Sequence, residues 1–197
     1  PDGGGENRGE LLELCAEAGN DLIVGNGFLF DGAMNEVAPN YPDINFAITD
    51  GVAEPSNVRG MLFKHAEGSY LAGIAAALKT KTNNVGFIGG VDFPLIHEFE
   101  QGFLAGVAEI NPDIVVQIGY ASVPPDFSGF NDPVKGKEIA LAQYEAGADI
   151  IYHAAGGTGT GMFEAAKEVS EATGSKVWGI GVDFDQYYQV GTPLPDL

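Results

Sequence analysis

Short apolar runs alternate with longer amphipathic runs along the whole chain. The short runs are apolar at consecutive positions, which is typical of strands that are buried on both faces of a parallel sheet. The longer runs repeat their apolar residues at the three- and four-residue spacing of a helix. This alternation predicts a parallel α/β fold in which helices cover both faces of each sheet.

Seven strands and six helices are predicted from these runs. The predicted strands cover residues 21–25, 46–50, 61–63, 85–89, 115–120, 149–152 and 177–182. The predicted helices cover residues 8–18, 32–38, 68–78, 95–110, 134–146 and 161–172. Gly19 follows the first helix, and Pro94 stands where the first turn of a helix tolerates proline, so both residues agree with these bounds.

The predicted elements fall into two ladders of βα units. The ladder over residues 1–64 has two or three strands, which is too few to close a core alone, whereas the ladder over residues 65–197 is nearly complete. The last residues are turn-forming and no helix completes the final unit. We therefore interpret the chain as the middle of a longer two-lobed protein, truncated at both ends. Residues 1–64 form an incomplete lobe I that lacks its first βα units, and residues 65–197 form lobe II.

The net charge of the chain limits the kinds of molecule that are expected to bind it. The sequence has 28 acidic and 9 basic residues, a formal net charge of −19. Nucleic acids and anionic membranes require a basic face, so neither is an expected partner. No run approaches the roughly 18 apolar residues of a membrane span. Cys15, the only cysteine, is predicted to lie on the buried stripe of the first helix.

Residues 147–186 are the most informative segment. They read as an apolar strand, a glycine-rich turn, a helix and a second apolar strand that ends at Asp183. In such a βαβ unit the turn and Asp183 both lie at the carboxyl ends of strands, where open parallel sheets bind ligands. Glycines let a ligand approach the backbone, and the helix N-terminus offers free N–H donors. The segment therefore predicts a site for a small polar molecule.

Two phosphate-binding motifs do not fit this turn. A P-loop ends in Gly-Lys-Ser/Thr, which is absent. The dinucleotide fingerprint G-x-G-x-x-G fails in every register, because Met162 or Glu164 stands at the third glycine. Asp183 nevertheless lies where an acid could accept hydrogen bonds from two vicinal hydroxyls, which predicts sugar binding. Its alternative role is to cap a following helix.

Two more residues are candidates for ligand contact. Asp50 ends the predicted strand 46–50 as Asp183 ends the later one, although Asp-Gly is also ordinary turn chemistry. Phe130 lies in a polar loop, where an exposed ring could stack on a flat base or a sugar face. Alternatively, Phe130 anchors its loop on the core. Three other phenylalanines are equally loop-like: Phe30, Phe93 and Phe127.

The sequence gives little support for a catalytic site. His65, His97 and His153 stand far apart with no metal-binding spacing, so neither a metal nor a cofactor is expected. Glu98 and Glu100 lie on opposite sides of their helix and cannot act as an acid–base pair. The sequence has no G-x-S-x-G nucleophile elbow. We therefore expect a protein that is not an enzyme. His153 ends the strand before the glycine-rich turn and could line or cap the site.

Several motifs occur together in a specific order. They are NFAITD at 45–50, GFIGG at 86–90 with Pro94 and 99–107, GADIIY at 147–152, AGGTGTG at 155–161 and GVDFDQ at 181–186. From about Glu10 to Gln186 the chain thereby resembles the basic membrane proteins, the PnrA-like (purine nucleoside receptor A) substrate-binding lipoproteins of ABC transporters.

The resemblance implies a type I periplasmic-binding-protein fold, in which two α/β lobes hold a nucleoside in the cleft between them. It also implies an extracytoplasmic lipoprotein anchored to the cell membrane, with an ABC permease as partner. The alternative is the ligand-sensing domain of a signalling or transcriptional regulator with the same fold.

The resemblance also implies roles for five residues. Asp50 would hydrogen-bond the ligand, and Phe130 would form one face of an aromatic sandwich on the base. Asp183 would accept the ribose hydroxyls. Gly156 and Gly157 would bring the backbone close to the ribose.

Overall fold

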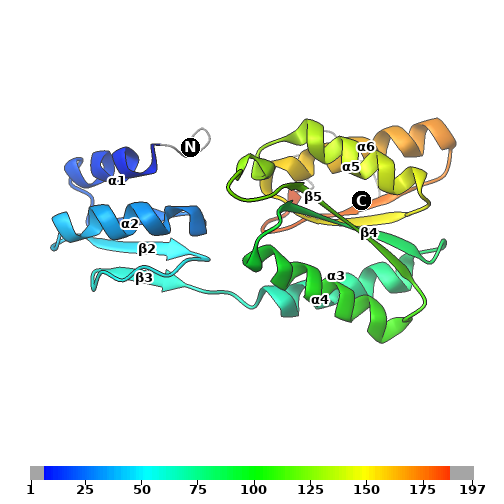
Figure 1. Cartoon of the computed structure of the whole chain (residues 1–197), viewed down its shortest axis with the longest axis horizontal. Coiled ribbons are helices and arrows are strands. Elements are labelled where there is room, and N and C mark those ends of the chain that lie inside the picture. Colours follow the sequence, from blue (N-terminus) through cyan, green and yellow to red (C-terminus); the bar gives the residue numbers. More distant parts are fainter. Residues whose placement is uncertain (1–6, 187–197) are drawn as a thin grey trace. The chain divides into compact units, whose positions relative to one another are not determined.

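A computed structural model describes residues 7–186 of the chain (Figure 1). The chain divides into two compact units, unit 1 over Pro1–Lys64 and unit 2 over His65–Leu197. Each unit contains its own parallel sheet with helices packed on it, which confirms the predicted α/β class. The assignment of the units as lobe I and lobe II stays a prediction.

Unit 1 is built around a three-stranded sheet with the order β1-β2-β3. Its elements are α1 (Arg8–Glu17), β1 (Leu22–Gly25), η1 (Phe28–Phe30), α2 (Asp31–Val37), η2 (Ala38–Asn40), β2 (Asn45–Thr49) and β3 (Val58–Met61). Figure 1 shows α1 and α2 on the same side of this sheet. A core forms there from both helices and two strands, and includes Leu12, Ala16, Ile23, Met34, Val37, Phe46 and Ile48.

The second face of this sheet differs from the prediction. Leu22 and Val24 alternate with buried residues along β1 and are 59% and 53% exposed. The expectation that helices cover both faces is therefore wrong for the described residues of unit 1.

Two further predictions in unit 1 are wrong. Cys15 is exposed, because α1 turns Leu12 and Ala16, one helical turn apart, toward the core and leaves Cys15 beside that stripe. The predicted strand at 61–63 overlaps β3 only at Met61, because the residues that pair with β2 are those from 58 to 61.

Unit 2 is built around a four-stranded sheet with the order β5-β4-β6-β7. Its elements are α3 (His65–Lys79), β4 (Asn84–Val91), α4 (Pro94–Ile110), β5 (Val115–Ser122), η3 (Ser128–Phe130), α5 (Pro133–Glu145), β6 (Ile150–Ala154), η4 (Gly156–Thr158), α6 (Gly159–Thr173) and β7 (Trp178–Ile180). The predicted helices and strands of this unit are all present, although β7 is shorter than the predicted strand 177–182.

Helices cover both faces of the unit 2 sheet, as predicted. Figure 1 shows α3 and α4 on one side and α5 and α6 on the other. Phe87 and Ile88 are neighbours on β4 and neither is exposed. Phe87 packs in a core with Phe103 of α4, whereas Ile88 packs in a separate core with Met162 of α6. Strand β4 is therefore central, and its consecutive apolar residues serve two cores.

Candidate functional site

Phe130 lies at the carboxyl edge of the unit 2 sheet. It ends η3, is partly buried, and packs against the core formed with α3 and α4. Its ring lies against Gly90 in β4, where a Cβ atom would stand only 2.4 Å from the ring carbon Cδ1. The missing side chain at position 90 therefore makes room for the ring. Phe130 is anchored on the core, and part of the residue remains accessible.

The glycine-rich turn lies directly against this aromatic residue. Gly156 adopts a φ of +54°, in the left-handed region that favours glycine. A Cβ atom there would lie 3.0 Å from the carbonyl oxygen of Phe130, and one on Gly157 would lie 3.4 Å from the same oxygen. The fold therefore brings together three of the five predicted site residues.

Thr158 fixes the two loops to each other. Its hydroxyl donates a hydrogen bond of 2.7 Å to the carbonyl oxygen of Gly129 and accepts one of 2.7 Å from the N–H of Asp132. Thr158 is fully buried, so these bonds are shielded from water and hold η3 and η4 in register.

Asp183 follows β7 at the same edge. It is exposed and adopts a φ of +68°. Burial raises the pKa of the Tyr152 hydroxyl and the negative charge of Asp183 raises it further, while a 3.0 Å hydrogen bond between Tyr152 and Ser69 acts in the opposite direction. The carboxylate of Asp183 is therefore close enough to the hydroxyl at β6 to act on it electrostatically.

His153 lies behind this surface. Of its two possible roles, lining the site does not fit, because the residue is completely buried. Its Nε2 atom lies 3.0 Å from Oε1 of Gln186. Burial lowers the pKa of His153 to about 4, although the bond to Gln186 acts in the opposite direction, so the ring is neutral at pH 7.

Asp50 belongs to unit 1, whereas the other four predicted residues belong to unit 2. It follows β2 with a φ of +58°, and its N–H donates a 2.9 Å hydrogen bond to the carbonyl oxygen of Met61. Asp50 and Asp183 therefore share a left-handed backbone beyond the end of a parallel strand, Asp50 directly after β2 and Asp183 a few residues after β7.

Asp31, which sequence reasoning missed, supports the turn after Asp50. Burial raises the pKa of its carboxyl group, and a hydrogen bond from the N–H of Val52 partly offsets this effect. Its Oδ1 atom lies 2.2 Å from the position that a Cβ atom of Gly51 would occupy. The Asp31 carboxylate thus accepts a hydrogen bond from the turn 50–52 and leaves no room for a side chain at Gly51, a long-range contact that the local sequence does not predict.

Thr49 is a second polar group that sequence reasoning missed near Asp50. Its hydroxyl accepts a 2.7 Å hydrogen bond from the N–H of Gly27 and donates one of 2.8 Å to Oδ1 of Asn26. The ends of β1 and β2 are thereby tied together by polar contacts.

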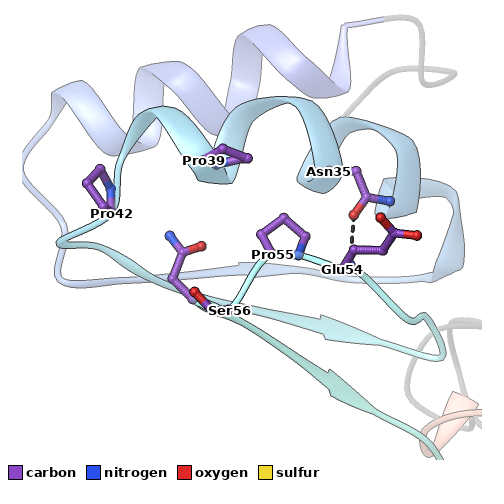
Figure 2. A pocket seen from close by; sticks show the side chains of 7 residues that line it. Asn35, Pro39, Pro42, Glu54, Pro55 and Ser56 are labelled. Atoms are coloured by element: carbon purple, nitrogen blue, oxygen red, sulfur yellow. Dashed lines mark hydrogen bonds between the residues drawn. The ribbon is translucent and has the colours of Figure 1, made fainter.

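A pocket of about 430 Å³ lies elsewhere in unit 1. It is lined by Asn35, Pro39, Pro42, Glu54, Pro55, Ser56 and Asn57. Figure 2 shows the side chain of Asn35 turned toward Glu54, whose N–H donates a 2.8 Å hydrogen bond to it. None of the five predicted site residues lines this pocket, so it is distinct from the candidate site.

In residues 7–186, no group of three or more His, Cys, Asp and Glu side chains is arranged to hold a metal ion. Among the helices of the same range, none has the length and apolar character needed to cross a membrane.

Two of the solved structures that resemble the chain are a solute-binding protein and a transcriptional activator. A solute-binding protein of an ABC transporter system from Aeropyrum pernix is 31% identical with a TM-score of 0.79, and the match covers 92% of this chain and 52% of that one. A transcriptional activator of the comK gene from Bacillus halodurans is 25% identical with a TM-score of 0.71, and the match covers 92% and 59%. The first of these supports the predicted periplasmic-binding-protein type of fold.

Sequence relatives agree with this result. The ABC transporter nucleoside-binding protein BmpA of Lactococcus lactis is 45% identical over 87% of this chain and 48% of its own length. Basic membrane protein A of Borreliella burgdorferi is 37% identical over 90% of this chain and 50% of its own length. The chain thus spans about half the length of these relatives. Residues 4–192 match the family model described as ABC transporter substrate-binding protein PnrA-like, and the chain therefore belongs to this PnrA-like family.

Proposed function

We propose that the protein is the substrate-binding component of an ABC importer and that its ligand is a nucleoside, with a purine as the base. It would act outside the cytoplasm as a membrane-anchored lipoprotein and deliver the nucleoside, chemically unchanged, to a permease. The observation that carries the proposal is the meeting of Phe130, Gly156 and Gly157 at one sheet edge, with Asp183 in the loop that follows β7 of the same sheet.

The chemistry of these groups fits a nucleoside. An aromatic ring held against a strand can stack on a flat base, and a glycine turn leaves the main chain open to the ribose. A carboxylate can accept hydrogen bonds from two vicinal hydroxyls, which suits Asp183 and the ribose. The proposed polar contacts, Asp50 and Asp183, are both acidic and would repel a phosphate group. A neutral nucleoside is therefore favoured over a nucleotide.

A second candidate is the ligand-sensing domain of a regulator. It is favoured by the similarity to a structure described as a transcriptional activator. A DNA-binding or signalling segment in the full-length protein would support this candidate, whereas a signal peptide with a lipid-anchor cysteine would support the receptor.

Calorimetric titration of the full-length protein with guanosine, inosine, adenosine, uridine and ribose tests the proposal. The Asp183→Ala variant should lose about 1.5–3 kcal/mol of binding free energy, or about 10- to 150-fold in affinity, on the scale of a hydrogen bond to a charged group. Asp113→Ala is the matched control, because Asp113 precedes β5 at the opposite edge of the sheet. Unchanged affinity in the Asp183 variant would remove Asp183 from the site, and turnover of the nucleoside would contradict the receptor function.

A further inference from the structure

A buried polar pair lies beneath the loop that carries Asp183. His153 in β6 is not exposed and Gln186 is 6% exposed. Oε1 of Gln186 lies 3.0 Å from Nε2 of His153 and accepts a 2.8 Å hydrogen bond from the N–H of Val182. One side-chain oxygen therefore joins the strand β6 to the residue that precedes Asp183.

The chemistry of these partners fixes the hydrogen positions. A main-chain N–H can only donate, so the atom of Gln186 that faces Val182 must be the oxygen. That oxygen can only accept, so Nε2 of His153 must carry the ring proton. Nδ1 is then the unprotonated nitrogen, and it is buried with no hydrogen-bond partner among residues 7–186. In this arrangement Nε2 of His153 donates the hydrogen bond and Oε1 of Gln186 accepts it.

Two glycines hold the pair in place. A Cβ atom on Gly181 would lie 2.3 Å from Oε1 of Gln186, and one on Gly159 would lie 2.0 Å from Cε1 of His153. The ring of Phe163 meets the His153 ring edge-on, with 5.6 Å between centroids. Both side chains are therefore packed closely against α6 and the chain that follows β7.

The loop above this pair is tightly turned. Val182 and Gln186 are its two buried ends, while the three residues between them are exposed. Asp183 has a φ of +68°, and the N–H of Phe184 donates a 2.8 Å hydrogen bond back to the carbonyl oxygen of Val182. A residue with a side chain keeps such a backbone only when its surroundings determine it. Gln186 is the contact that closes this loop.

We propose that Gln186 and His153 are positioning residues, which hold residues 182–186 in the conformation that presents Asp183 to the ligand without contacting the ligand themselves. This inference rests on the proposed function, in which Asp183 binds the ribose hydroxyls. Asp183 lies in the loop that Gln186 closes, so loss of the buried acceptor should act on ribose recognition and leave base stacking intact.

The test compares Gln186→Met, which keeps the shape but removes the acceptor, with Gln186→Glu, which keeps the acceptor atoms. An exposed glutamine on α4 provides the control Gln101→Met. Gln186→Met should weaken guanosine binding by about tenfold, as for the loss of one hydrogen bond. Its affinity for 2′,3′-dideoxyguanosine should stay within about twofold of the wild type. Gln186→Glu should restore part of the guanosine affinity. Combined with Asp183→Ala, Gln186→Met should add little further loss, because both act on one interaction.

Hydrogen exchange of residues 182–186 gives a readout that needs no ligand, and it should be faster in Gln186→Met than in the wild type. If this variant does not fold, His153→Leu keeps the bond between Gln186 and Val182 and should show a smaller effect of the same kind. Equal loss of guanosine and dideoxyguanosine binding, or unchanged exchange and affinity, overturns the inference. If the wild type binds no nucleoside, the proposed function fails, and exchange alone decides whether the pair orders the loop.

Discussion

The buried histidine gives unit 2 a specific dependence of stability on pH. We compare the wild type with His153→Leu while the pH is lowered from 7 to 5. Burial lowers the pKa of His153 from 6.5 to about 4 in the folded protein. As the pH falls, the unfolded chain therefore binds this proton before the folded one does, so stability is complete above pH 6.5 and is lost between pH 6.5 and 4.

The two pKa values set the size of the effect. A difference between 6.5 and about 4, at 1.36 kcal/mol per pKa unit, corresponds to about 3 kcal/mol over the whole range. About 2 kcal/mol of this falls between pH 7 and pH 5, where the unfolded histidine is protonated and the folded one is mostly neutral. His153→Leu lacks this contribution. Its free energy of unfolding should therefore fall by about 2 kcal/mol less than that of the wild type over the same range.

Urea unfolding at pH 7, 6 and 5 measures this difference. Trp178 is the only tryptophan of the sequence and lies in β7, so its fluorescence reports on unit 2. The carboxylates and the other two histidines are present in both proteins, and their contributions cancel in the comparison. Parallel free-energy curves for the two proteins would show that His153 titrates alike in the folded and unfolded states, which would refute the reasoning from burial.

Two further predictions concern glycines with crowded surroundings. Gly159→Ala should destabilise unit 2 by about 1–3 kcal/mol in the same urea assay, because the new methyl group would overlap the His153 ring. The control Gly68→Ala lies in α3 with open space around it and should stabilise by about 0.5–1 kcal/mol; equal effects of the two changes would contradict the predicted overlap. Gly90→Ala should displace the Phe130 ring and weaken guanosine binding by about 0.5–1.5 kcal/mol, the scale of an aromatic contact, while ribose binding stays the same. Calorimetry that found full guanosine affinity in Gly90→Ala would remove Phe130 from the proposed base site.

Much of unit 2 follows from local patterns. The run 85–89 is apolar at every position except its glycines, which predicts a strand buried on both faces, and β4 lies between two cores. Unit 1 shows the limit of this argument. Successive residues of β1 point alternately to the core and to an exposed face. The sequence of β1 does not say whether helices cover one face of its sheet or both. The prediction that Cys15 is buried is wrong for a similar reason. The apolar stripe of a short helix does not fix which of its residues face the core.

The sequence by itself determined the parallel α/β class, and it identified the glycine-rich turn and the acids that follow strands as candidates. These features are local, because neighbouring residues determine strand ends, turns and helix starts. Parallel strands then bring their carboxyl ends to one edge of the sheet. Only the tertiary structure decided which side chains meet there. The contact of Phe130 with Gly90, the burial of His153 and its bond to Gln186 join residues far apart in the chain. Their positions depend on close packing, which fixes side chains by shape and by the need to pair buried polar groups.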